Sequence, residues 1–265
     1  MEWQDRVCVV TGASSGFGLE TTKALAERGA TVVAVARREE KLQEVVDELG
    51  GEPHTYQTCD VSDLESIREL VEKVSDSHDF IDVLVNNAGI PSAGPLKKAS
   101  SEKMEQVIRT NLLGSIWCTK EMLPLLDAAP RTSRTPVVVN VASMAGRLPV
   151  PKSADYVASK FGLVGYTEAV WHDLEEFGIK AMMVNPGAAD TEGFPMEQVR
   201  ANPLTRWTVM DADRVANAVV RGIERGAYEV RVQWWLHLVY HASVVMGPMR
   251  RYAASLIRSQ YKGEW

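Results

Sequence analysis

The chain has 265 residues, of which 45% are hydrophobic and 24% are charged, and its formal net charge is −6. This composition is ordinary for a globular protein with one large core, and the acidic balance argues against nucleic acid as a partner. Cys8, Cys59 and Cys118 have neither the spacing of a zinc site nor the even number of a disulfide framework, so no metal is expected. No apolar signal segment precedes the first expected strand, and we therefore expect a cytoplasmic protein.

Strands and helices are predicted to alternate along the chain, because short apolar runs alternate with segments of helical apolar spacing. In chain order we expect a strand at 7–10, a helix from the glycines at 16–18 to 28, a strand at 31–36, a helix at 39–49, a strand at 54–59, a helix at 64–77, a strand at 83–85, a long helix from 100 that includes 104–121, a strand at 137–142, a helix through 156 to about 177, and a strand at 181–184. Such alternation predicts an α/β fold, a Rossmann-type three-layer doubly wound parallel sheet. No repeat or linker marks a second domain, so residues 1–265 are expected to form a single domain.

The first expected strand runs directly into a glycine-rich turn, Thr11 to Gly18, with the spacing G-x-x-x-G-x-G. Such a turn can be a mere chain reversal. Between a strand and a helix, however, glycines let the backbone approach a pyrophosphate, and the helix N-terminus offers unpaired N–H groups. We therefore expect a dinucleotide-binding turn formed by Gly12, Ser14, Ser15, Gly16, Phe17 and Gly18.

Tyr156 and Lys160 are one helical turn apart, and Ser143 lies upstream of them after the fifth expected strand. Residues at i and i+4 share a helix face, so the lysine ammonium is expected near the tyrosine phenol. A neighbouring positive charge lowers the pKa of a tyrosine from its ordinary value near ~10, and reaching neutral pH requires roughly 3–4 kcal/mol. The lysine together with an oxidised nicotinamide, which is also positive, would be the source of this free energy. Ser143 would donate a hydrogen bond to a substrate oxygen where negative charge develops. The alternative is an amphipathic helix with an unrelated serine.

Several motifs in order resemble the short-chain dehydrogenase/reductase family between Arg6 and Thr191. They are T-G-x-x-x-G-x-G at 11–18, N-N-A-G at 86–89, Ser143, Y-x-x-x-K at 156–160, and Pro186-Gly187. The resemblance implies nicotinamide-dependent carbonyl/alcohol chemistry with Asn111, Ser143, Tyr156 and Lys160 as a catalytic tetrad. In such enzymes the asparagine helps hold a water beside the lysine. Without the resemblance, Asn111 is only a polar residue inside a helix.

The resemblance also assigns cofactor contacts outside the glycine turn. These contacts are Asp60, Val61, Asn87, Ala88, Gly89, Tyr156, Lys160, Pro186, Gly187, Ala189 and Thr191. Asp60 is expected on the adenine amine, although an aspartate there can equally cap a turn. Ala189 departs from the bulkier aliphatic residue that is usual in the family, which puts the packing under the nicotinamide ring in doubt.

The end of the second expected strand indicates which cofactor is used. An NAD site places an acidic residue there to bind the ribose hydroxyls, whereas this chain has Ala36 followed by Arg37 and Arg38. A guanidinium can bind a 2′-phosphate, and Arg37 is the better candidate, with Ser14 as a second donor. Both arginines could instead be solvated residues that begin the next helix. We predict NADP(H) rather than NAD(H).

The last third of the chain is expected to form a substrate lobe, at about 188–210 and 233–265. It carries the large apolar side chains Phe194, Met196, Leu204, Trp207, Trp234, Trp235, Leu236, Leu238 and Tyr240. An apolar pocket favours a hydrophobic alcohol or ketone, although each of these residues could instead fill the core or a subunit interface.

Residues 234–249 form an apolar run followed by basic residues, and this run could touch a membrane. It is shorter than the ~20 residues that span a bilayer, and we favour a lid or a dimer contact over an interfacial helix. His237 and His241 have the spacing of helical metal ligands, but no third ligand is evident.

The favoured function is an NADP(H)-dependent oxidoreductase that interconverts a small apolar carbonyl and its alcohol, with Tyr156 as general acid and base. The rival is a non-catalytic NADP(H)-binding sensor or regulatory protein, which would be expected to lose catalytic residues. Within the enzyme class, the alternative is a membrane-docked lipid carbonyl reductase. Family analogy suggests a homodimer or homotetramer packed through the helices of Asn111 and Tyr156.

Overall fold

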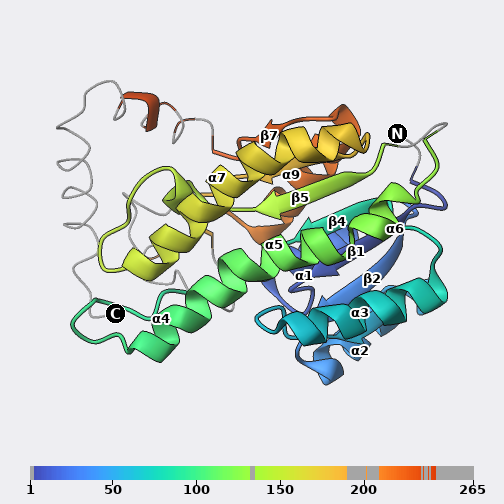
Figure 1. The fold of residues 1–265 in the computed structure, drawn as a ribbon, viewed down its shortest axis with the longest axis horizontal. Helices are drawn as coiled ribbons and strands as arrows, with labels where there is room; N and C mark the ends of the chain where they lie inside the picture. The colour runs from blue at the N-terminus through green and yellow to red at the C-terminus, as the bar shows by residue number, and fades with distance from the viewer. Residues whose placement is uncertain are drawn as a thin grey trace.

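The computed structural model describes residues 3–131, 135–189, 201, 209–233, 235, 238 and 240–242. A parallel sheet of seven strands, in the order β3-β2-β1-β4-β5-β6-β7, forms its centre (Figure 1). The strands are β1 (Val7–Thr11), β2 (Thr31–Ala36), β3 (Thr55–Thr58), β4 (Val83–Asn86), β5 (Val137–Val141), β6 (Lys180–Val184) and β7 (Glu229–Val230). The helices are α1 (Gly16–Ala26), α2 (Glu39–Glu48), α3 (Leu64–Ser77), α4 (Ser101–Ile108), α5 (Gly114–Glu121), α6 (Leu123–Asp127), α7 (Ala154–Glu176) and α9 (Ala212–Arg225). The predicted Rossmann-type doubly wound sheet is confirmed.

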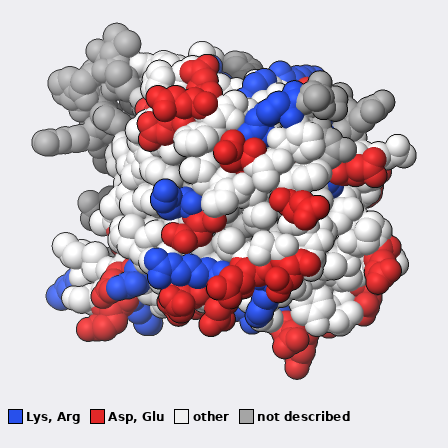
Figure 2. Space-filling model, turned by 45° about the vertical axis from the view of Figure 1, so that its right-hand side comes forward, with Lys and Arg blue, Asp and Glu red and all other residues white. Residues whose placement is uncertain are grey.

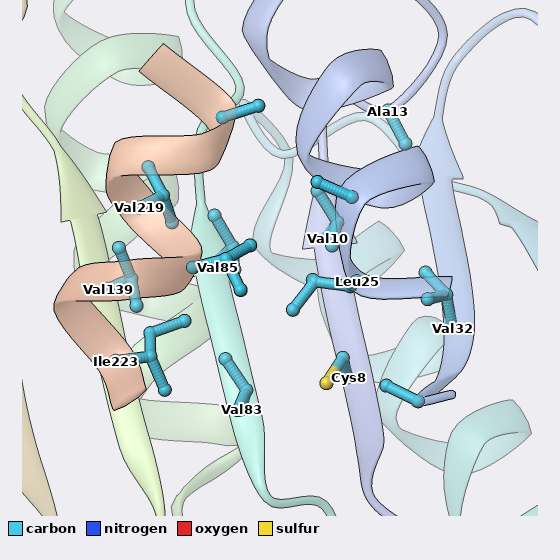
Figure 3. Close-up of a cluster of buried hydrophobic side chains, with 14 of the residues drawn as sticks. Cys8, Val10, Ala13, Leu25, Val32, Val83, Val85, Val139, Val219 and Ile223 are labelled. Atoms are coloured by element: carbon cyan, nitrogen blue, oxygen red, sulfur yellow. The ribbon is translucent and has the colours of Figure 1, made fainter. Parts of the chain in front are cut away.

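The central strands are apolar along their whole length because helices cover both faces of the sheet. On one face, side chains of α1 and α9 such as Leu25 and Ile223 pack against Cys8 and Val85 (Figure 3). On the other face, residues of α3, α5, α6 and α7 pack on Val9 and Val138. The two cores fix the helices on either side of a rigid sheet.

The predicted elements differ from the structure in two regions of the chain. The long helix expected from residue 100 is interrupted by a π-helical turn, Arg109–Leu113, between α4 and α5. Such turns are rare and often occur at functional sites. Further on, α9 and β7 fall in a stretch for which we predicted no element. The apolar stripe of α9, with buried Val215, Val219 and Ile223, packs beside α1, and Gly226 ends the helix with φ 63°.

The order of the strands indicates where in the sheet a ligand would bind. The chain leaves β1 toward β2 and β3 on one side and continues with β4, β5 and β6 on the other. The carboxyl ends of β1 and β4 therefore border a crevice where the connections diverge, which is the usual ligand position in open α/β sheets. Gly12, Asn87 and Ser143 each follow a strand at this edge.

The outer surface carries charges of both signs. On the face shown in Figure 2, lysine and arginine side chains lie among aspartates and glutamates and form no continuous basic surface. None of the helices in the described part of the chain has both the length and the apolarity that crossing a bilayer requires.

Candidate active site

A cleft of about 400 Å³ opens at the carboxyl edge of β1, β2 and β4. Most of the predicted cofactor contacts line it. They are Gly12, Ser14, Ser15, Gly16, Phe17, Arg37, Asp60, Val61, Asn87, Ala88, Gly89, Tyr156 and Lys160. The structure thus brings the glycine turn at one end of the cleft together with the Tyr156 helix at the other.

The glycines of the turn are required by close backbone contacts. Gly12 has φ +69°, and a Cβ there would lie 2.8 Å from Asn87 Nδ2. A Cβ at Gly18 would lie 2.2 Å from the Gly12 carbonyl oxygen. No other residue fits this conformation without moving the backbone, so the turn is built to remain open beside the start of α1.

Thr11 fastens the glycine turn to the segment after β4. Its hydroxyl donates to the Val85 carbonyl at 3.2 Å and accepts from the backbone N–H groups of Asn87 and Ala88 at 3.0 and 3.1 Å. Asn87 Nδ2 donates back to the Thr11 carbonyl at 2.9 Å. These bonds make the two predicted cofactor-binding segments one rigid wall.

The two arginines after β2 make different contacts from those that the sequence predicts. Arg37 lies 3.7 Å from the Asp60 carboxylate, whereas Arg38 donates to the hydroxyls of Ser14 and Ser15 at 3.1 and 3.2 Å. The guanidinium that meets Ser14 is therefore that of Arg38, not Arg37. Nothing in the residue pattern distinguishes the two, because the direction of each side chain depends on how α2 begins.

Asp60 is held in its ionised form. Burial alone would raise its pKa, but hydrogen bonds from the Ser62 hydroxyl and N–H, at 2.7 and 3.0 Å, and the charge of Arg37 lower it below the ordinary value. The carboxylate is thus an anionic acceptor at the end of β3, where the family resemblance places the adenine contact.

Tyr156 and Lys160 lie on the first turns of α7 and face the end of the cleft. Lys160 is only 4% exposed, and its Nζ donates to the Val141 carbonyl at 2.9 Å. Nζ lies 5.8 Å from the centroid of the Tyr156 ring. A hydrogen bond joins the Ser143 hydroxyl to the tyrosine, and Ser143 Oγ accepts from the Ala145 N–H at 3.0 Å. A serine, a tyrosine and a lysine therefore meet beside one wall of the cleft.

Burial dominates the acid–base properties of this group. It raises the pKa of Tyr156 to about 12, and the hydrogen bond from Ser143 acts in the opposite direction. It also lowers the pKa of Lys160 to about 8. The sequence led us to expect a tyrosine pKa lowered by the lysine. Without the charge of an oxidised nicotinamide, which that expectation also included, the pKa of Tyr156 shifts in the opposite direction, because loss of hydration disfavours the charged form of both residues.

Asn111 is fully buried in the π-helical turn. Its Oδ1 accepts from the Ile90 N–H at 2.7 Å, and its Nδ2 donates to the Ile90 carbonyl at 3.0 Å and to Ser159 Oγ at 3.3 Å. The side chain thus fixes the loop after β4 against α7. A Cβ at Gly89 would lie 3.3 Å from Asn111 Oδ1, so a larger residue there would require the amide to shift by a few tenths of an ångström.

A buried chain of amides orients α7 on the sheet. Asn86 Nδ2 donates to Asn140 Oδ1 at 2.9 Å, and Asn140 Nδ2 donates to the Thr167 hydroxyl at 3.0 Å. The chain joins β4 and β5 to the middle of the helix that carries Tyr156. Hydrogen-bonded polar groups inside a core are sensitive to geometry, so they restrict how this helix can sit.

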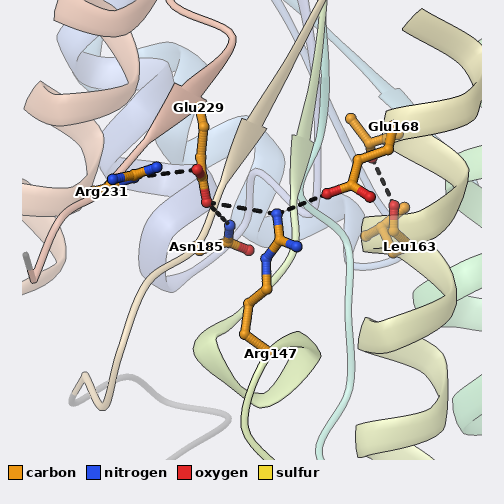
Figure 4. A network of polar contacts seen from close by, with 7 residues as sticks. Arg147, Leu163, Glu168, Asn185, Glu229 and Arg231 are labelled. Carbon is orange, nitrogen blue, oxygen red and sulfur yellow. Dashed lines mark hydrogen bonds and ion pairs between the residues drawn. The ribbon is translucent and has the colours of Figure 1, made fainter. Parts of the chain in front are cut away.

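An ion-pair network holds the segment after Ser143 (Figure 4). Arg147 lies 2.8 Å from Glu168 of α7 and 3.7 Å from Glu229 of β7. Glu229 also accepts from Asn185 Nδ2 at 2.8 Å. No sequence pattern predicts this network, because its members are far apart in the chain and become neighbours only through the sheet order.

The remaining predicted residues either follow β6 in the chain or lie outside the described residues. The Pro186 carbonyl accepts from the Met144 N–H at 2.8 Å, and Gly187 follows it in the same loop. Ala189 pairs with Met210 in a parallel bridge. Thr191 lies outside the described residues, as do Phe194, Met196, Leu204, Trp207, Trp234, Leu236 and His237.

Part of the expected C-terminal lobe is described. Leu238 is 59% exposed, and the Arg147 guanidinium lies 5.6 Å from the centroid of the Tyr240 ring.

The described residues contain no group of three His, Cys, Asp or Glu side chains that could hold a metal ion. Cys8, Cys59 and Cys118 are free and buried.

Comparisons with known proteins agree with this geometry. The family model for short chain dehydrogenases matches residues 6–200. A 3-oxoacyl-(acyl-carrier-protein) reductase of Thermotoga maritima is 36% identical over 211 residues, which cover 78% of this chain and 84% of that protein. A metagenomic short-chain oxidoreductase crystallised with NADP is 30% identical, with a TM-score of 0.71 over 87% of this chain and 97% of its own. A short-chain dehydrogenase/reductase of Burkholderia phymatum in complex with NAD has the same fold, with a TM-score of 0.80 at 24% identity over 93% and 96% of the two chains. The chain belongs to the short-chain dehydrogenase/reductase family and is an NAD(P)-dependent oxidoreductase.

Proposed function

We propose that this protein reduces the carbonyl group of a hydrophobic substrate with NADPH, and oxidises the corresponding alcohol in the reverse direction. The observation that carries the proposal is the group of Ser143, Tyr156 and Lys160 at one end of a cleft whose other end is the glycine turn. A dinucleotide would lie along the cleft with its pyrophosphate at Gly12 to Gly18, where the glycines leave room for it.

The residues of the chain provide proton transfer and charge stabilisation. The chemistry that a bound nicotinamide would supply is hydride transfer, to the carbonyl carbon in reduction and from the carbon that bears the hydroxyl in oxidation. In reduction, Tyr156 donates its phenolic proton to the carbonyl oxygen, and the Ser143 hydroxyl donates a hydrogen bond to the same oxygen. In oxidation, Tyr156 accepts the alcohol proton. With a pKa of about 12 in the protein itself, Tyr156 holds its proton at neutral pH and is ready to act as a general acid.

Lys160 and Asn111 support this proton transfer in the proposal. Lys160 is close enough to the Tyr156 ring for its charge to favour the phenolate, and it would also bind the cofactor ribose. Asn111 would take part in the proton path by holding the loop at Ile90 and, as family analogy suggests, a water beside Lys160.

The preference for NADP(H) rests on the residues after β2. Ala36 stands where an NAD site would hold an acid, and both Arg37 and Arg38 line the cleft. Arg38 lies beside the Ser14 and Ser15 hydroxyls, so a 2′-phosphate could bind guanidinium and hydroxyl donors together. We therefore propose that both arginines, rather than Arg37 alone, select NADP(H).

A hydrophobic substrate is proposed from the apolar residues at about 188–210 and 233–265, which would form the substrate lobe of this single domain. The Thermotoga maritima relative is named as a reductase of 3-oxoacyl groups, which are apolar chains with a carbonyl. Acyl thioesters with a 3-oxo group therefore belong beside apolar aldehydes and ketones in a test. We also propose a homo-oligomer that packs through α7, where Phe161 is 36% exposed.

The test is the oxidation of NADPH and of NADH, followed at 340 nm, with such a panel. Tyr156→Phe keeps the ring but removes the proton donor, and Tyr166→Phe on the same helix is the matched control. We expect NADPH-dependent turnover that Tyr156→Phe abolishes and Tyr166→Phe retains. Tight NADPH binding without turnover in either direction would instead favour the sensor hypothesis. Equal use of NADH would refute the role given to the arginines.

A further inference from the structure

A buried carboxylate directly before Tyr156 has no part in the chemistry described above. Asp155 is 4% exposed and lies in the first turn of α7. Its Oδ1 accepts from the Ser92 hydroxyl at 2.5 Å, and its Oδ2 accepts from the Ala93 N–H at 2.7 Å. Ser92 Oγ in turn accepts from the Gly94 N–H at 3.0 Å. Asp155 therefore binds one short stretch of the loop between β4 and α4.

The helix end that carries Tyr156 has no side-chain cap at its N-cap residue. The residue at the N-cap of α7, Ser153, makes no side-chain hydrogen bond to the helix, and Lys152 before it has a φ of +64°. A helix start without such a cap is weakly fixed by its own residues. Adjacent residues of a helix point about 100° apart, so Asp155 can bind the loop while Tyr156 faces the cleft.

The same loop is held a second time, at its other end. Asn111 binds both the N–H and the carbonyl of Ile90, at 2.7 and 3.0 Å. Ile90, where Asn111 binds, and Pro91, which lies between the two attachments, line the cleft. The stretch 90–94 is therefore a wall of the cleft with Asn111 holding one end and Asp155 the other.

We propose that Asp155 is a positioning residue of the reaction. It fixes loop 90–94 to the first turn of α7 and thereby sets the distance between that wall of the cleft and the Tyr156 hydroxyl. This proposal rests on the proposed function of Tyr156 as the proton donor. A displacement of about 1 Å at a reacting group can lower a rate by about 100-fold, so loss of the tether should affect the chemical step.

The competing interpretation is that Asp155 only stabilises its helix, because a carboxylate in a first turn interacts favourably with the helix dipole. Asp213 provides the matched control, since it is an exposed acid in the first turn of α9. Asp213→Ala removes the same kind of helix interaction without releasing loop 90–94. Asp155→Asn is the conservative variant, because an amide can still accept from the Ala93 N–H and donate to Ser92 Oγ.

The first measurement is hydrogen exchange of the peptide that contains Ala93, which requires no turnover. Wild type, Asp155→Ala, Asp155→Asn, Ser92→Ala and Asp213→Ala are compared in the full-length protein. We expect exchange of the loop amides to increase about tenfold or more in Asp155→Ala, less in Asp155→Asn, and not in Asp213→Ala. Unchanged loop exchange in Asp155→Ala would overturn the tether.

The second measurement relates the tether to chemistry, using the best carbonyl substrate and NADPH deuterated at the transferred position. We expect kcat/KM of Asp155→Ala to fall about 10- to 100-fold while the NADPH Kd stays within about twofold. The deuterium isotope effect should increase because hydride transfer becomes more strongly rate-limiting. A loss of kcat that only follows a loss of NADPH-binding sites, with an unchanged isotope effect, would show a structural role and refute the proposal.

Two further points keep the test decisive. If Asp155→Ala does not fold, Ser92→Ala and Asp155→Asn carry the same comparison, since each alters the tether and leaves the core intact. If wild type turns over no carbonyl, the proposed function fails, whereas the exchange measurement still decides whether Asp155 holds the loop.

Discussion

Replacement of Lys160 by methionine should make the protein more stable while it removes activity. The pKa of Lys160 is lowered from 10.5 to about 8 because the ammonium is buried. Each tenfold change in proton affinity corresponds to about 1.4 kcal/mol. The buried charge of Lys160 therefore lowers the free energy of unfolding by about 3 kcal/mol at neutral pH. Methionine has a similar length and no charge, but it leaves the Val141 carbonyl without its donor, which costs about 1 kcal/mol. We expect a net gain of about 2 kcal/mol in the free energy of unfolding at pH 7.

The sign of the pH dependence provides a sharper test than the gain itself. Below pH 8, Lys160 is charged in both the folded and the unfolded protein, so the buried charge has its full destabilising effect. Between about pH 8 and 10.5 the unfolded chain keeps the proton that the folded protein has released, so wild type becomes more stable as the pH rises. The difference between Lys160→Met and wild type should therefore shrink from about 2 kcal/mol at pH 7 to about zero near pH 10.

Urea unfolding of both proteins at pH 7, 8, 9 and 10, with a thiol reductant present, gives this difference directly. Lys98→Met, at an exposed position in the loop before α4, is the control for replacing a lysine by methionine. At about 2–4 °C for each kcal/mol, the midpoint of thermal unfolding should rise by about 4–8 °C at pH 7. A variant that is less stable than wild type at pH 7, or a difference that does not change with pH, would refute the assignment of a buried, charged lysine.

Three further predictions concern the turn, the arginines and the direction of the reaction. Gly18→Ala should lower the free energy of unfolding by more than about 2 kcal/mol and weaken NADPH binding at least tenfold, because its Cβ would overlap the Gly12 carbonyl. Urea unfolding measures the first effect, and fluorescence titration with NADPH measures the second. Joint replacement of Arg37 and Arg38 by alanine should raise the NADPH Kd about 100-fold and leave the NADH Kd within about threefold, and equal weakening of both cofactors would contradict 2′-phosphate recognition. Since the pKa of Tyr156 lies near 12, the rate of alcohol oxidation should increase with pH across the neutral range, whereas the rate of carbonyl reduction should not. Parallel pH profiles of the two rates in steady-state assays would argue against Tyr156 as the shared acid and base.

The sheet and the glycine-turn end of the cleft could be predicted from the sequence because their signals are local. The strand at Thr31–Ala36 and the helix at Leu64–Ser77 have the predicted bounds, since a buried strand and an amphipathic helix each follow from a short pattern. The glycine turn follows from spacing between a strand and a helix. Helix α9 could also have been found, because Val215, Val219 and Ile223 repeat at helical spacing.

Other features depend on distances that no local pattern contains. The arginine that meets Ser14 is decided by side-chain directions at the start of α2, and the contact of Asp155 with Ser92 joins residues 63 positions apart. The direction of the Tyr156 pKa in the protein without cofactor could not be predicted for a related reason. The spacing of Tyr156 and Lys160 indicates that they are neighbours, but only the fold shows that both lose their hydration.

The opposite pKa shifts of Tyr156 and Lys160 have one cause and favour one direction of the proposed reaction. Burial stabilises the neutral form of each residue, so the tyrosine keeps its proton and the lysine gives up its proton more readily. A proton donor is therefore already in place for reduction, whereas forming the phenolate at pH 7 from a pKa of about 12 requires roughly 7 kcal/mol. Oxidation would need that free energy from positive charge beside the ring, which Lys160, with Nζ 5.8 Å from the ring centroid, and an oxidised nicotinamide would together supply in the proposed mechanism. In the proposed mechanism, burial therefore favours the protonated tyrosine that reduction needs, whereas oxidation would depend more strongly on the charge of the cofactor.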